Sequence, residues 1–109
     1  MNQSGNSAII GSKQKRYAPK TTTTSLGPCD NYVETDSTAG AFTVTMPFSY
    51  ECPQGSIYII RHIVDNGDIT IAYKTGDRGP ASQVITIANG WVALTPGPGR
   101  WVLVGSLLS

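Results

Sequence analysis

The sequence contains little charge, little cysteine and almost no histidine. Charged residues make up 14% of its 109 residues, whereas soluble domains typically contain about 25%. Cys29, Cys52 and His62 are its whole supply of sulfur and imidazole ligands, which is too small for a metal-binding cluster. We therefore expect neither a metal nor another cofactor. A small secreted domain normally carries more cysteines, so two reduced thiols are favoured over a bond between Cys29 and Cys52.

Long hydrophobic runs are also missing. The apolar stretch Trp101–Leu108 is far shorter than the roughly 20 residues of a membrane-spanning helix. The segment Ala8–Gly11 is too short for the apolar part of a signal peptide, and the basic residues follow it rather than precede it. We expect a chain that does not enter a membrane and is not exported by a signal peptide.

Acidic residues are absent before Asp30, although four of the eight basic residues lie in the first twenty positions. Residues 1–28 contain few apolar side chains and show neither a helical nor an alternating period. Such a segment predicts an extended basic arm that becomes ordered on a partner, joined to a folded domain at residues 29–109. The side chains expected to anchor the arm are Lys13, Lys15, Arg16, Tyr17 and Lys20.

The folded domain is a series of short β-branched and aromatic segments separated by Gly, Pro and Asn. The predicted strands are Tyr32–Thr35, Ala41–Met46, Ser56–Val64, Ile69–Lys74, Gln83–Ala88, Trp91–Thr95 and Arg100–Leu107. Asn66-Gly67 and Asn89-Gly90 favour type I′ hairpin turns, and Pro98-Gly99 favours a type II turn. The pattern predicts an all-β fold, a small antiparallel β-sandwich or barrel that is jelly-roll-like and rich in meanders.

The segment Ser56–Val64 is apolar at both alternating sets of positions, as in a strand that is covered on two sides. A body of roughly 80 residues buries only a marginal core by itself, and the low charge suggests that another chain covers part of its surface. We therefore expect a homo-oligomer. The candidates for its interface or for the core are Ile57, Ile59, Ile60, Arg61, His62, Trp91 and Trp101.

The residues that could form a catalytic site are explained better as ordinary turn and packing residues. No spacing supports a nucleophilic pair of a cysteine with His62. Asp65 and Asp68 flank an Asn-Gly turn, where acids are ordinary turn residues rather than a catalytic or calcium-binding set. The glycines around Pro98 lack the lysine and the following helix of a phosphate-binding loop. We therefore expect that the protein is not an enzyme.

Two kinds of binding remain open. Exposed aromatic residues can form stacking platforms for sugars or single-stranded nucleic acid, and Tyr50 is the aromatic residue expected to be most exposed. The four basic residues of the arm could bind nucleic acid, but they are a weak electrostatic footprint on a nearly neutral chain. An acidic protein surface is the favoured partner of the arm.

The order of motifs in the second half of the chain resembles a small β-domain that recurs in virion proteins of tailed phages. The motifs are Thr43-Val44-Thr45-Met46-Pro47, Gly55 with Tyr58-Ile59-Ile60, Asn66-Gly67 before Ile69-Thr70-Ile71, Ile85-Thr86-Ile87, and Gly99-Arg100-Trp101-Val102-Leu103-Val104. The likeness covers roughly residues 41–105, and the arm has no counterpart in it.

This resemblance implies a virion structural protein that is commonly trimeric. The function expected first is a capsid decoration (cement) protein, made in the host cytoplasm and placed on the capsid exterior. Its partners would be copies of itself and the major capsid protein, which the arm would contact. The alternative is a receptor-binding knob of a head or tail fibre, which could recognise carbohydrate.

Overall fold

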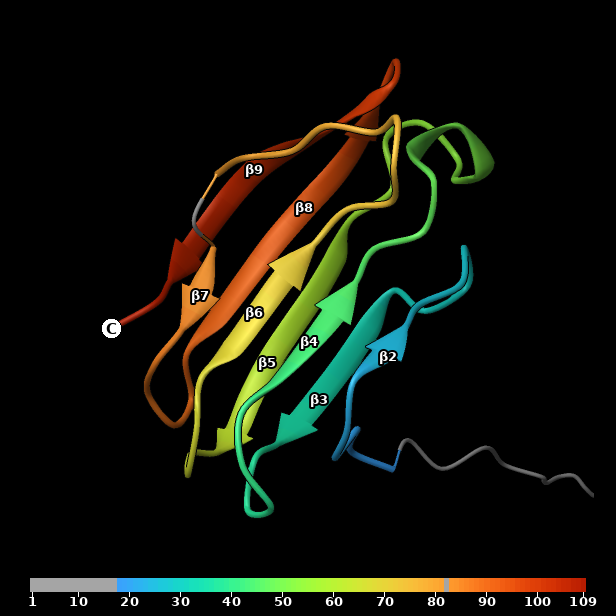
Figure 1. The fold of residues 1–109 in the computed structure, drawn as a ribbon. Coiled ribbons are helices and arrows are strands. Elements are labelled where there is room, and N and C mark those ends of the chain that lie inside the picture. The colour runs from blue at the N-terminus through green and yellow to red at the C-terminus, as the bar shows by residue number, and fades with distance from the viewer. Residues whose placement is uncertain (1–17, 82) are drawn as a thin grey trace, which may run out of the picture.

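The computed structural model describes residues 18–81 and 83–109, which form two four-stranded sheets packed face to face (Figure 1). The first sheet has the order β2-β4-β6-β7 and the second has the order β3-β5-β8-β9. The expected small β-sandwich is therefore confirmed. The strands of the first sheet are β2 (Thr24–Ser25), β4 (Phe42–Thr45), β6 (Ile69–Ala72) and β7 (Val84–Ile85). Those of the second are β3 (Tyr32–Asp36), β5 (Tyr58–Val64), β8 (Trp91–Gly97) and β9 (Arg100–Leu107).

The core lies between the two sheets and is built by alternation along each strand. Since successive side chains point to opposite faces, the apolar residues at every second position meet in the middle. Tyr58 and Trp101 occupy one part of this core, with ring centroids 5.1 Å apart in an edge-to-face arrangement. Other residues of the core are Val33, Phe42, Val44, Met46, Ile60, Ile69, Ile71, Ile85, Val92 and Leu94.

The sheets are mixed, whereas the sequence predicted antiparallel meanders. Strand β2 pairs in parallel with β4, β4 with β6, and β3 with β5. From β2 to β6 the chain changes sheet at every step, and Figure 1 shows β2, β4 and β6 pointing one way while β3 and β5 point the other. This part of the chain winds around the core like the coils of a solenoid. Among the strands of the described residues, β5 with β8, β6 with β7, and β8 with β9 pair in an antiparallel direction.

The predicted Asn66-Gly67 hairpin is wrong, because β5 and β6 lie in different sheets. The turn between them is an arch that crosses the sandwich and stacks on the preceding arch at residues 37–41. Gly67 has no positive φ. It is needed for space instead, since a Cβ there would lie 2.3 Å from the Ala41 amide nitrogen.

The other two turns have different outcomes. Pro98 and Gly99 form the predicted tight turn between β8 and β9, with Gly97 opposite Arg100 and a positive φ of 63° at Gly99, as a type II turn requires. Asn89 has the predicted positive φ, 67°. The strands on either side of it belong to different sheets, so it is not part of a hairpin.

The boundary expected between arm and body at residue 28 needs correction. The Lys20 amide donates to the Glu34 carbonyl at 2.8 Å, and β2 pairs with β4. Leu26 is buried in the core. Residues 20–28 are therefore an edge of the sandwich, and the part of the expected arm at residues 1–17 lies outside the described residues.

Candidate functional site

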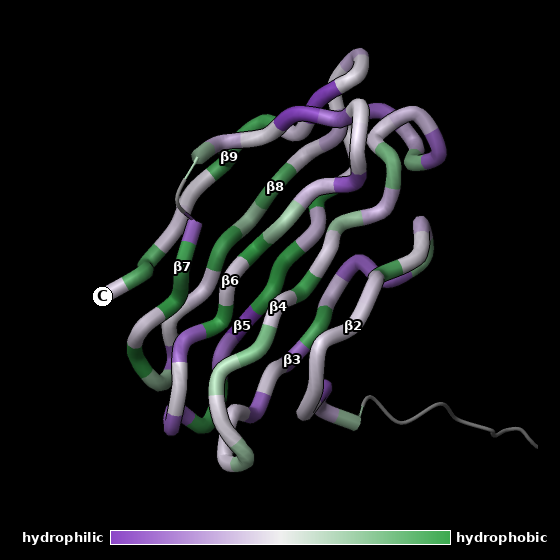
Figure 2. Tube along the Cα trace, in the orientation of Figure 1, coloured by the Kyte–Doolittle hydropathy of each residue, from purple (hydrophilic) through white to green (hydrophobic). Residues whose placement is uncertain are grey.

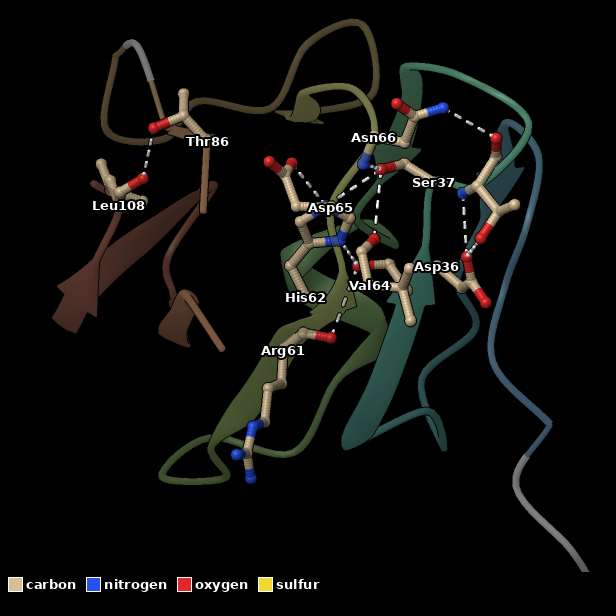
Figure 3. Close-up of polar contacts among 11 residues, drawn as sticks. Asp36, Ser37, Arg61, His62, Val64, Asp65, Asn66, Thr86 and Leu108 are labelled. Atoms are coloured by element: carbon tan, nitrogen blue, oxygen red, sulfur yellow. Dashed lines mark hydrogen bonds and ion pairs between the residues drawn. The ribbon is translucent and has the colours of Figure 1, made fainter. Parts of the chain in front are cut away.

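His62 is fully buried beneath the two stacked arches, in the polar cluster drawn in Figure 3. Its Nδ1 lies 2.9 Å from the Thr35 hydroxyl. Its Nε2 lies 3.1 Å from both the Ser37 hydroxyl and a carboxylate oxygen of Asp65. The backbone amide of Asn66 completes the cluster by donating to the Ser37 hydroxyl oxygen at 2.7 Å.

The partners of His62 decide which ring nitrogen donates. The Ser37 hydroxyl donates to the Val64 carbonyl at 3.2 Å, and a carboxylate such as that of Asp65 can only accept. Nε2 is therefore the donor, and its proton is shared between Ser37 and Asp65. Thr35 can donate to Nδ1 of a neutral ring or accept from it when the ring is charged.

This cluster contains Ser, His and Asp but lacks the geometry of a catalytic triad. In a triad the nucleophile and the acid contact different ring nitrogens, whereas here Ser37 and Asp65 share Nε2. Ser37 and His62 are both fully buried, and both are saturated with hydrogen bonds. The arrangement joins the arches and satisfies buried polar groups beneath them.

The outer face of the second sheet is apolar and exposed. Pairing places Tyr32 beside Ile59, Arg61 beside Trp91, and Trp91 beside Leu107, and paired residues project from the same side. The exposed fractions are 37% for Tyr32, 42% for Ile57, 40% for Val102 and 46% for Leu107. Figure 2 shows hydrophobic stretches along β5, β8 and β9. We define the apolar outer face as Tyr32, Ile57, Ile59, Trp91, Val102 and Leu107.

A shallow hollow of about 440 Å³ lies on this face and is lined by Tyr32, Ile59, Arg61, Asn89 and Trp91. The Arg61 guanidinium donates to the Asn89 side-chain oxygen at 3.1 Å. The Tyr32 hydroxyl donates to Glu34 at 2.8 Å, and this hydrogen bond raises the pKa of Tyr32. Apolar walls with a few oriented polar groups are typical of recognition sites.

The outer face of the first sheet has different chemistry. Its outward positions carry Thr43 and Thr45 on β4, and Thr70 and Ala72 on β6, in adjacent parallel register. Ser25 lies beside Thr45. We call these residues the threonine face. Small hydroxyl side chains of this kind are ordinary on a solvated β-surface.

The loops that connect the sheets at the end opposite the His62 cluster carry exposed aromatic and basic side chains. Tyr50 is 71% exposed, which confirms that it is the most exposed aromatic residue in the described ranges. Its ring stacks on Phe48 with centroids 5.0 Å apart, and Lys74 Nζ lies 4.9 Å from the centre of the Phe48 ring. Asp77 fixes this loop by accepting from the Ser49 amide and hydroxyl, both at 2.8 Å.

The candidates predicted from the sequence divide by the face of the strand on which they lie. Ile60, His62 and Trp101 point inward and are buried, whereas Ile57 and Arg61 are exposed and Ile59 and Trp91 are partly exposed. Lys20 is an exposed residue at the edge of the sandwich. The remaining arm candidates, Lys13, Lys15, Arg16 and Tyr17, lie outside the described residues.

Sequence reasoning missed Tyr32 and Asn89 as partners of this surface, because their places depend on which strands are neighbours. Cys29 and Cys52 both carry free thiols, and burial raises the pKa of Cys52. Among the residues that the structure describes, no three potential ligands gather in a metal-binding group. The same residues include no helix long and apolar enough to span a membrane.

Comparison with protein-family models, with curated proteins and with solved structures yields no match to this chain.

Proposed function

We propose that the chain is a structural assembly protein that associates with copies of itself through the apolar outer face. Following the resemblance of its motifs, we propose the specific role of a trimeric decoration protein on a phage capsid, with a basic N-terminal segment that contacts the major capsid protein. The observation that carries the proposal is the exposed aromatic and aliphatic surface on only one of the two sheets.

The composition of this face supports self-association. Interface cores are enriched in Tyr, Trp and Arg and depleted in Lys and Asp, and Trp, Tyr and Arg contribute most of the binding energy. Tyr32, Trp91 and Arg61 line one hollow of the face. A contiguous apolar surface of this kind is unusual in a protein that stays monomeric.

The charges at the margin of the face favour a second copy as the occupant. Glu34 and Arg61 lie in register on β3 and β5, yet they form no ion pair with each other within 4.0 Å. A surface that presents one group of each sign can pair with itself, since Arg61 of one copy can face Glu34 of the next. This arrangement serves a closed ring of identical subunits.

The test is the oligomeric state of the full chain by analytical ultracentrifugation over a range of concentrations. Ile59→Glu and Trp91→Glu each place a charge on the apolar outer face and should convert the oligomer to a monomer. Thr43→Glu and Thr70→Glu are matched controls on the threonine face and should leave it unchanged. A wild-type chain that is monomeric at all concentrations would contradict self-association.

The capsid role needs a separate measurement, namely co-sedimentation with empty capsids of a candidate phage. The full chain should bind, and removal of residues 1–17 should weaken binding strongly while the oligomer persists. This truncation leaves residues 20–28 in place, because they belong to the sandwich. If the full chain and the truncated chain bound capsids equally well, the N-terminal segment would have no role in capsid binding.

The alternative function is a receptor-binding knob of a phage fibre. It is favoured by Tyr50, whose exposed ring stands at the loop end of the sandwich. This function predicts binding to cell-surface carbohydrate that is lost in Tyr50→Ala and kept in Tyr32→Ala, because Tyr32 lies on the sheet face instead. A glycan array without any bound sugar would count against it.

A further inference from the structure

Two arginines stand side by side at the loop end of the sandwich. Arg78 and Arg100 are partners in an isolated parallel bridge, and the Trp101 amide donates to the Arg78 carbonyl at 2.7 Å. Residues in register project from the same side of a ladder, and both arginines are exposed. Their guanidinium groups therefore extend from neighbouring backbone positions.

Acidic groups of the described residues do not neutralise this pair. Within residues 18–81 and 83–109, no lysine or arginine nitrogen lies within 4.0 Å of a carboxylate oxygen. Asp77 is adjacent to Arg78 in sequence, but both of its carboxylate oxygens accept hydrogen bonds from Ser49. Like charges directly opposite each other destabilise a β-ladder, so the pair reduces stability unless an anion binds to it.

Hydrogen bonds join the loop of Tyr50 to the two segments that carry these arginines. The Trp101 indole donates to the Pro47 carbonyl at 3.0 Å, which ties the start of β9 to the loop that contains Tyr50. The Ser49–Asp77 hydrogen bonds tie that loop to the segment of Arg78. Three loops that are distant in sequence thus bring an exposed aromatic ring and two guanidinium groups to one end of the molecule.

We propose that this end binds an acidic polysaccharide. The planar guanidinium groups of Arg78 and Arg100 form paired hydrogen bonds with a carboxylate or sulfate group, and the exposed ring of Tyr50 offers a flat apolar surface to a neighbouring sugar ring. The site adjoins the loop end of the apolar outer face, since Arg100 and Val102 lie on the same side of β9. It gives the protein a function in surface recognition that does not depend on the capsid role.

The experiment measures binding of the full chain to four immobilised probes: oligogalacturonate, heparin oligosaccharide, neutral dextran and poly-L-glutamate. We expect binding to at least one of the two acidic glycans, no binding to dextran, and weaker binding to poly-L-glutamate. Arg78→Gln combined with Arg100→Gln should reduce glycan affinity by about tenfold or more, as the loss of charge-assisted hydrogen bonds predicts. Lys20→Gln is the matched control, because Lys20 pairs with Thr35 near the His62 cluster, at the other end of the sandwich. It should retain wild-type affinity.

A thermal unfolding measurement at low salt distinguishes a binding role from a structural one. Because the two arginines repel each other in the unbound protein, either single glutamine variant should keep or raise the melting temperature. Arg100→Lys retains the charge without the planar fork and should also bind more weakly.

Several outcomes would overturn the proposal. They are a lower melting temperature with both glutamine variants, an equal loss of affinity in Lys20→Gln, equal binding to dextran, and equal binding to poly-L-glutamate. The last of these would indicate a docking surface for acidic proteins instead. Absence of binding to both acidic glycans would also overturn it. Because Trp91→Glu should abolish the oligomer without altering this end, its glycan binding separates failure of this site from failure of self-association.

Discussion

The two outer faces of the sandwich differ although the strands beneath them follow the same alternation. On β4 and β6 the outward positions carry Thr43, Thr45 and Thr70. On β5 and β8 they carry Ile59, Arg61 and Trp91, beside Tyr32 of β3. Both sheets contribute inward residues to one core, so folding alone does not require the second outer face to be apolar.

This difference separates residues that serve folding from residues that we propose serve self-association. A threonine on a solvated face satisfies the strand preference of the backbone without exposing a large apolar group. An exposed isoleucine, tryptophan or tyrosine favours strands equally well but leaves apolar surface that other chains can bury. The composition of the apolar outer face therefore favours the proposed self-association, whereas that of the threonine face does not.

The largest expected effect compares neighbouring isoleucines of β5. Ile60 is fully buried between the sheets, so Ile60→Ala should lower the free energy of unfolding by about 2–5 kcal/mol. Ile59 projects from the opposite face and is only partly buried. Ile59→Ala should lower the unfolding free energy of a monomeric background such as Trp91→Glu by less than about 1 kcal/mol.

The measurement is urea unfolding of both variants, followed by sedimentation of Ile59→Ala without the second substitution. Its main effect should be weaker self-association. Equal losses of unfolding free energy at the two positions would show that the outer face is buried within a single chain, and the contrast between the faces would then be lost.

The positions of the strands could be predicted from the sequence, but their neighbours could not. All seven predicted segments contain an observed strand, because β-branched alternation and turn residues are local signals. Asn66-Gly67 is equally compatible with a hairpin and with an arch between sheets. The arch forms because Gly67 packs on the Ala41 backbone and the Asn66 backbone amide donates to Ser37. Both partners belong to the preceding arch at residues 37–41, which is distant in sequence from this turn.

The candidate sites show the same difference between local signals, which the sequence contains, and strand neighbours, which it does not reveal. Periodicity indicated that Ser56–Val64 has two apolar faces, which is why both Ile59 and Ile60 were among the candidates. Arg78 and Arg100 carry no local signal, since they become neighbours only through the pairing of a loop with β9. The two-residue strand Thr24–Ser25 was missed for a similar reason, because its polar residues become a strand only by pairing with β4.

A smaller effect is expected when a buried threonine is compared with an exposed threonine on the threonine face. Thr35 is fully buried, and its hydroxyl lies 2.9 Å from His62 Nδ1. Thr35→Val keeps the shape but leaves that nitrogen without its partner, so it should lower the unfolding free energy by about 1–3 kcal/mol. Thr70→Val on the threonine face is the matched control and should change it by no more than about 0.5 kcal/mol.

Chemical denaturation at neutral pH would measure both variants. If Thr35→Val were as stable as the wild type, the hydrogen bonds around His62 would contribute nothing to holding the arches together. A large loss in Thr70→Val would instead show that the threonine face is packed against something within the chain.

The smallest expected effect compares an inward and an outward tyrosine at alkaline pH. Burial raises the pKa of Tyr58 to about 12, above its unfolded value near 10. Its contribution to stability is therefore complete below pH 10 and is lost between about pH 10 and 12, reaching a loss of about 1 kcal/mol at pH 11. Tyr73, whose pKa is also raised to about 12 by burial, adds a loss in the same range.

Tyr58→Phe removes the hydroxyl that donates to the Pro28 carbonyl, so this variant is less stable at neutral pH but loses less of its remaining stability on going from pH 9 to pH 11. Tyr32→Phe is the outward control, and both variants are compared in the monomeric Trp91→Glu background. There Tyr32→Phe should reduce the alkaline loss only slightly, because Tyr32 is partly solvated and its raised pKa comes mainly from the hydrogen bond to Glu34. Urea unfolding at pH 9 and pH 11 measures both differences. If Tyr32→Phe flattened the pH dependence more than Tyr58→Phe in this background, the outer face would be the more strongly desolvated of the two within a single chain.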